Sequence, residues 1–167
     1  MSMFRTKLAA EPETAQEFEA AAESRYWEGV ELASAGRGYA GACLLGYTAE
    51  ILLKLAALRL DGLSPATLVK QRLPPARVWM KKHAPGVDAE SYHNLLFWMV
   101  LIREKRAWQG RPLEAQLDAM FTQRVRRLSG NWWVEMRYRQ SRLLDREIHC
   151  VYDDVSWMRD RYIELWR

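Results

Sequence analysis

The chain has 167 residues, a net charge of +4 and two cysteines, Cys43 and Cys150. This length suits one domain, residues 1–167, which can bury a core without a metal or a disulfide, so we expect both cysteines to be reduced core residues. Acidic side chains come too early for a targeting peptide, and charged residues interrupt the most apolar stretch, residues 39–60. We therefore expect no membrane span and a cytoplasmic protein.

The charge is distributed unevenly along the chain. Residues 1–36 carry seven glutamates against three basic side chains, whereas residues 103–146 carry eleven Arg or Lys against five acids. Arginine supplies most of this positive charge and suits bidentate contact with phosphate. The pattern indicates a nucleic-acid surface, with ordinary solvated helix faces as the alternative reading.

Two long helices are predicted first, over residues 12–35 and 39–60, separated by a glycine-rich break. The short connection predicts antiparallel packing. We expect the first helix to pack on a stripe of small residues in the second, made of Gly38, Ala42, Gly46 and Ala49.

Shorter elements follow, with helices predicted over residues 65–73 and 76–83 and a stop at Pro74-Pro75. Asp88 is the predicted cap of a helix over residues 89–108. The centre of that helix, residues 95–102, is apolar on all sides, so we expect a second subunit to cover part of it.

The last predicted elements are a helix over residues 112–128, an irregular segment over 131–140 and a helix over 141–166. Apolar residues recur at spacings of three and four in the final helix, which predicts one core-facing side. Strand-like alternation is absent from the sequence. The predicted fold is all-α, an up-and-down antiparallel helical bundle with two short inserted helices.

Three blocks of sequence resemble the HEPN superfamily (higher eukaryotes and prokaryotes nucleotide-binding domain), as a divergent bacterial member. The first matches the second-helix signature through Gly38, Tyr39, Gly46, Tyr47, Ala49, Glu50 and Lys54. The second, residues 93–96, is similar to a His-x-Leu element, and the third, residues 133–138, to a Trp-x-x-x-Arg-Tyr element.

The resemblance implies a helical bundle that commonly forms homodimers. Members of the superfamily include ribonuclease toxins, subunits of nucleotidyltransferase-linked toxin–antitoxin pairs, and proteins with no known activity. From this we expect a dimeric, non-catalytic module in a bacterial defence or toxin–antitoxin setting, acting through protein contacts or through RNA or a nucleotide. A nucleotidyltransferase antitoxin is an expected partner. A purely structural oligomerisation domain is a further alternative.

Arg142 and His149 are the candidate catalytic residues of the other alternative, a metal-independent endoribonuclease. The ribonuclease branch of the superfamily carries an Arg, four to six residues and then a His near the start of its last helix. Here six residues separate the two, so both can lie on one helix face. Arg142 could bind the scissile phosphate while His149 moves a proton. The competing interpretation places His149 on a solvated face, paired with Asp145 and Asp153.

Glu50 and Lys54 form an oppositely charged pair four residues apart inside an apolar helix, where each charge needs a partner. We expect a polar core cluster in which Arg137 contacts Glu50 and Tyr138 lies nearby. The alternative is a pocket for a nucleotide or another anion.

The sequence Glu90-x-x-His93 resembles half of a di-iron motif, but such sites need two copies and two further glutamates. We therefore expect no metal and no cofactor, with His93 in a local cap or local hydrogen bond.

Overall fold

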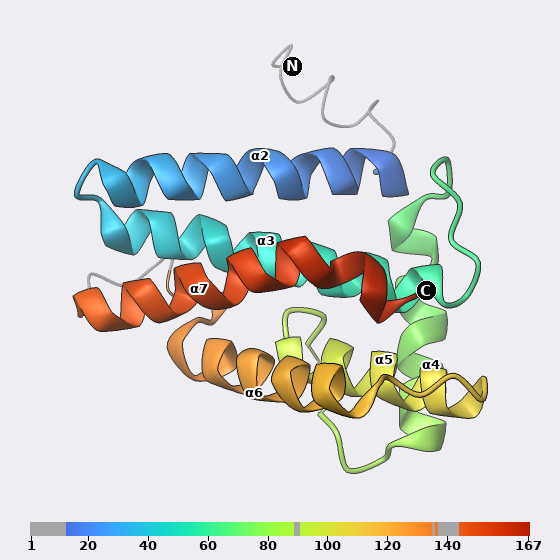
Figure 1. Cartoon of the computed structure of the whole chain (residues 1–167). Helices are drawn as coiled ribbons and strands as arrows, with labels where there is room; N and C mark the ends of the chain where they lie inside the picture. Colours follow the sequence, from blue (N-terminus) through green and yellow to red (C-terminus); the bar gives the residue numbers. More distant parts are fainter. Residues whose placement is uncertain (1–12, 89–90, 135, 137–143) are drawn as a thin grey trace.

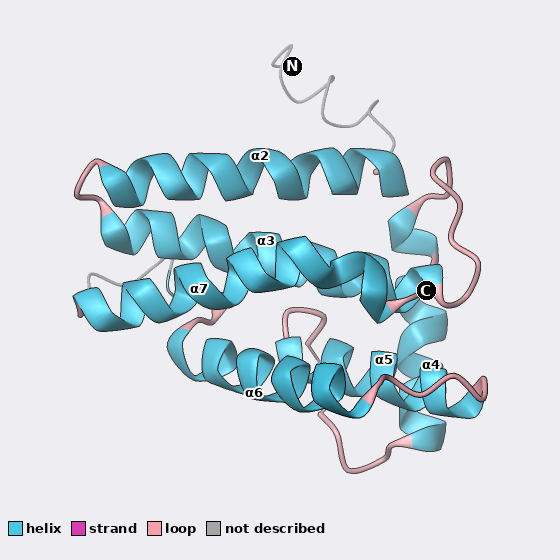
Figure 2. Ribbon diagram, viewed as in Figure 1, coloured by secondary structure: helices cyan, strands magenta, loops and turns pink. Residues whose placement is uncertain are grey.

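The computed structural model describes residues 13–88, 91–134, 136 and 144–167. Over these residues the protein is all-helical: the helices pack into an antiparallel bundle, and strands are absent apart from one isolated bridge between Thr14 and Leu68 (Figures 1 and 2). The predicted fold class is confirmed.

Helices α2 (Ala15–Ser34) and α3 (Gly38–Arg59) form the first antiparallel pair (Figure 1). Thr14 begins α2 with a capping box, because its hydroxyl accepts from the Glu17 amide at 3.2 Å while the Glu17 carboxylate accepts from the Thr14 amide at 2.8 Å. The turn between the helices places Gly36 at a φ of +75°, a conformation that favours glycine.

The predicted small-residue stripe does not act as one surface. Gly41 faces α2, where its hydrogens lie against the Gly29 carbonyl, so the two backbones approach closely. Gly38 instead faces Ile148, and Gly46 faces the indole of Trp132. The prediction that α2 packs on Gly38 and Gly46 is therefore wrong, because α3 uses glycines on several sides to admit several neighbours.

Helix α3 is the centre of the bundle and is buried along most of its length. Residue packing connects it to α2, α5 (Leu95–Trp108) and α7 (Asp145–Arg161). Among the described helices only α3 is long and apolar enough to cross a membrane, and 78% of that apolar window is buried inside the protein. This is compatible with a core helix of a soluble protein.

The region after α3 differs from prediction. Residues 69–71 form a single 3₁₀ turn, η1 (Val69–Gln71), in place of the expected helix over 65–73. Helix α4 (Leu73–His83) includes Pro74 and Pro75 in its first turn, whereas we expected them to end a helix. A first turn tolerates proline because its amides have no partner within the helix.

Helix α5 begins at Leu95, with Asn94 as its cap and not Asp88. The Asn94 side chain accepts hydrogen bonds from the amides of Leu96 and Phe97 at 3.0 and 3.4 Å. Within the single chain, Phe97, Trp98, Met99, Leu101 and Ile102 are already at most 3% exposed. The apolar stretch therefore does not require a second subunit to cover it.

Helix α6 (Ala115–Asn131) runs through the expected stop at Ser129-Gly130, and α7 is followed by the 3₁₀ turn η3 (Tyr162–Leu165). Asp154 of α7 is fully buried among the apolar positions of that helix. Its carboxylate accepts from Arg124 at 3.1 Å and from Arg127 through two nitrogens, which fastens α6 to α7. These bonds raise the pKa of the Arg127 guanidinium.

Candidate functional site

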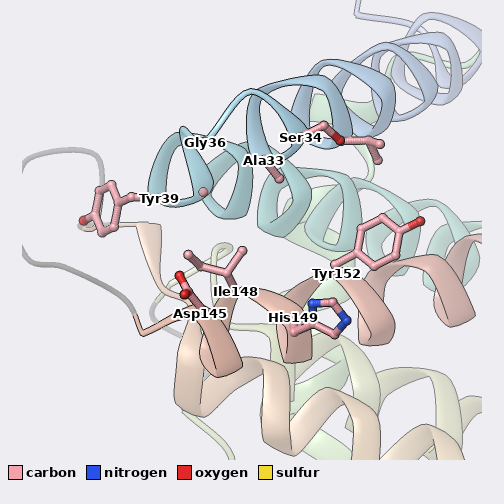
Figure 3. A pocket seen from close by; sticks show the side chains of 10 residues that line it. Ala33, Ser34, Gly36, Tyr39, Asp145, Ile148, His149 and Tyr152 are labelled. Atoms are coloured by element: carbon pink, nitrogen blue, oxygen red, sulfur yellow. The ribbon is translucent and has the colours of Figure 1, made fainter.

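A cavity of about 580 Å³ lies where the start of α7 meets the α2–α3 turn. Figure 3 shows α2 and the turn on one side and α7 on the other. The residues that line it are Val30, Ala33, Ser34, Gly36, Gly38, Tyr39, Asp145, Ile148, His149 and Tyr152. A volume of this order is typical of small-ligand sites.

The cavity forms because residues at the end of α2 and in the α2–α3 turn are small. Gly36 and Ala33 leave the space that Ile148 and Tyr152 border from α7 (Figure 3). Tyr39 is fixed at the rim, since its hydroxyl donates to the Met136 carbonyl at 2.5 Å. The site therefore combines aromatic and aliphatic walls with a histidine and an aspartate.

The predicted catalytic histidine, His149, lies at this cavity and is exposed. Its predicted partner Arg142 falls outside the described residues. The competing interpretation placed His149 on a solvated face, and the side chain is indeed exposed. It also paired His149 with Asp145 and Asp153, but within the described part of the chain neither ion pair is present. The imidazole is free to contact a ligand.

The second predicted cluster is centred on Glu50, whose side chain is 5% exposed. Lys54 Nζ lies 2.5 Å from Glu50 Oε1, as the spacing predicts, and 5.9 Å from the centre of the Trp98 ring. Arg137 and Tyr138, the other predicted members, lie outside the described residues.

His93 completes this cluster, a role that its place in the sequence did not indicate. Its Nδ1 lies 3.0 Å from both carboxylate oxygens of Glu50. The expected local hydrogen bond is present only at the backbone, where the His93 amide donates to Ser91 Oγ at 3.2 Å. The ring instead contacts Glu50, because the turn before α5 brings residue 93 against the middle of α3. The sequence signal for this contact is Glu50 itself, because a buried carboxylate needs more than one hydrogen-bond partner.

Several basic side chains of residues 103–146 form ion pairs with acidic residues of the same chain. Arg103 forms a bidentate pair with Asp118 at 2.6 and 2.8 Å, and Lys105 pairs with Asp61. Arg124 and Arg127 are held by Asp154. The predicted nucleic-acid surface cannot use these side chains at full strength, because a paired guanidinium offers fewer free donors to phosphate.

Two further predictions concern cysteines and metals. Cys43 and Cys150 are free thiols, half-buried and not in the core, and burial raises the pKa of Cys43. Among the described residues, no group of three or more His, Cys, Asp or Glu is placed to hold a metal ion.

Comparison of the chain with family models, with curated proteins and with solved structures finds no match in any of the three. The HEPN resemblance thus stays a hypothesis drawn from motifs.

Proposed function

We propose that this chain is a HEPN-like helical module that binds single-stranded RNA, without cleaving it, at the cavity between the α2–α3 turn and α7. The homodimer, the cytoplasmic location and the toxin–antitoxin setting with a nucleotidyltransferase partner belong to the same proposal and rest on the resemblance. A domain that serves oligomerisation alone is the competing function if RNA is not bound.

One observation supports the RNA proposal most directly: an open cavity with tyrosines at its wall and rim, some of whose lining residues are followed in the sequence by unpaired cations. Tyr39 and Tyr152 offer ring faces on which bases can stack. Arg37 and Arg146 are exposed, adjoin lining residues in sequence, and form no ion pair within the described part of the chain. Such cations suit the phosphates that flank a stacked base.

Changing Tyr152 to alanine is expected to weaken binding of a single-stranded RNA oligonucleotide by about 1–3 kcal/mol, the usual contribution of one stacked base. Fluorescence anisotropy over a series of salt concentrations measures this, and the affinity of the unmodified protein should fall steeply with salt. Trp108→Ala is the matched control, since Trp108 is 72% exposed at the end of α5 and does not line the cavity. Equal affinities for the Tyr152→Ala variant and the unmodified protein would refute the proposal.

A second function, metal-independent RNA cleavage by Arg142 and His149, is favoured by the exposure of His149 at the cavity. Under this function the protein cleaves RNA in the presence of a chelator, and His149→Ala lowers the rate by about 10²–10⁴, the usual contribution of a positioned acid or base. His83→Ala serves as the control, because His83 is also exposed and follows Arg77 at similar spacing. Cleavage that survives in His149→Ala would exclude this function.

A further inference from the structure

The contact between Glu50 and His93 defines which nitrogen of the imidazole carries a proton. An ionised carboxylate accepts hydrogen bonds and donates none. With both Glu50 oxygens 3.0 Å from Nδ1, that nitrogen is the donor. In the neutral ring the lone pair is then on Nε2, on the far side of the ring from Glu50.

His93 also lines a second, smaller cavity. The His93 side chain is 48% exposed, and within the described residues no hydrogen bond engages Nε2. The cavity has a volume of about 210 Å³ and lies between the N-terminus of α5 and the C-terminal end of α6. Its lining includes Asp88, Ser91, His93, Asn94, Ser129 and Trp133.

Lys54 gives the carboxylate a fixed position. Its ammonium holds Glu50 Oε1, and the two side chains are 9% and 5% exposed. Glu50 is thus contacted both by a buried cation and by an imidazole. A structural pair needs no imidazole open to a cavity, whereas a carboxylate that orients a half-exposed histidine is the arrangement used in general-base catalysis.

We propose that Glu50 and His93 form a proton-accepting dyad for a small hydroxyl-bearing ligand, an alcohol or water, bound in the α5–α6 cavity. The oxygen attacks the acyl carbon of a carboxylic ester while its O–H proton passes to Nε2. The bond from that carbon to the ester oxygen then breaks, and the imidazolium returns its proton to the leaving alcohol or to solvent. The Nδ1 proton stays on the ring, and Glu50 stabilises the imidazolium that forms. Hydroxyl, amide and carboxylate groups in the lining suit a small polar ligand. This dyad shares no residue with the proposed RNA site.

The tautomer of His93 is the first test and needs no substitution. The chain has three histidines, so ¹⁵N-labelled full-length protein gives three resolvable imidazoles by NMR. His93 is expected to show a proton on Nδ1 when neutral. His83 is the internal reference, because its Nδ1 lies 2.9 Å from the Trp79 carbonyl, which can only accept. A neutral His93 with its proton on Nε2 would overturn the proposal.

The second test uses p-nitrophenyl acetate as the probe. Water attacks the acetyl carbon, its proton passes to Nε2, p-nitrophenolate leaves, and the imidazolium returns the proton to solvent. We expect His93→Gln to lower the protein-dependent rate of p-nitrophenyl acetate hydrolysis by at least about tenfold. This lower bound is smaller than the usual contribution of a positioned general base. His83→Gln should leave it unchanged, and circular dichroism checks that each variant is folded. Equal loss in the two variants, or no loss in His93→Gln, would contradict the dyad.

Discussion

Replacing Asp154 with alanine is expected to lower the free energy of unfolding by about 3 kcal/mol. Asp154 is fully buried and is the shared acceptor of Arg124 and Arg127. Removing one member of a buried ion pair leaves its partner charge uncompensated, which costs about 3–5 kcal/mol. The lower figure is expected because Arg127 is 39% exposed and can turn toward water. Urea denaturation, followed by circular dichroism, measures the change.

The adjacent acid provides the control for this prediction. Asp153 is exposed on the same helix, and Asp153→Ala should change the free energy of unfolding by less than about 0.5 kcal/mol, as for most surface substitutions. Arg127→Ala should cost less than Asp154→Ala, since Arg124 still pairs with the carboxylate. If Asp153→Ala and Asp154→Ala were equally destabilising, the buried arginine contacts would not be what joins α6 to α7.

Replacing Gly46 with alanine is expected to destabilise the protein by about 3 kcal/mol, although alanine is the better helix former by about 1 kcal/mol. A methyl group at Gly46 would overlap the indole of Trp132. Trp132 is 2% exposed and its Nε1 donates to the Cys43 carbonyl at 3.2 Å, so the ring cannot move without losing its packing and this bond. Overfilling a packed core costs about 1–3 kcal/mol before the lost bond is added.

Gly130→Ala is the matched control for Gly46→Ala. Gly130 lies within α6, and a methyl group there meets no atom within 4 Å. This variant should therefore gain up to about 1 kcal/mol. Thermal unfolding of the two variants should shift in opposite directions. A Gly46→Ala variant as stable as the unmodified protein would show that Trp132 does not pack against α3.

The long helices could be predicted because hydrophobic periodicity and glycine breaks are local signals. Both helices of the α2–α3 pair were expected within a few residues of their observed bounds. The start of α5 was missed by six residues, because Asp88 and Asn94 are both good caps and only packing against α3 selects the second. Pro74 and Pro75 were misread for a similar reason: a proline pair can end one helix or begin another.

The candidate site was harder to predict because its contacts join residues far apart in the chain. The Glu50–Lys54 pair lies within one helix and was predicted, but its contact with His93 spans 43 residues. Asp154 lies among the apolar positions Val151, Val155 and Met158 of the last helix. An acid at such a position predicts a buried cationic partner, a prediction that could have been made from the sequence. Nothing in the pattern indicated which arginines of α6 would supply it.

The directions of α2 and α7 determine where a fusion partner or a surface linker can be attached without blocking the cavity. Tyr162, near the C-terminus, donates a hydrogen bond to Glu19 in the first turns of α2, so Thr14 and Arg167 lie at one end of the bundle (Figure 1). The α2–α3 turn, with the 580 Å³ cavity, lies at the opposite end. A fusion partner joined after Arg167 would begin about one helix length from the cavity mouth and leave that mouth accessible. The same holds for a reporter group or for a linker to a surface.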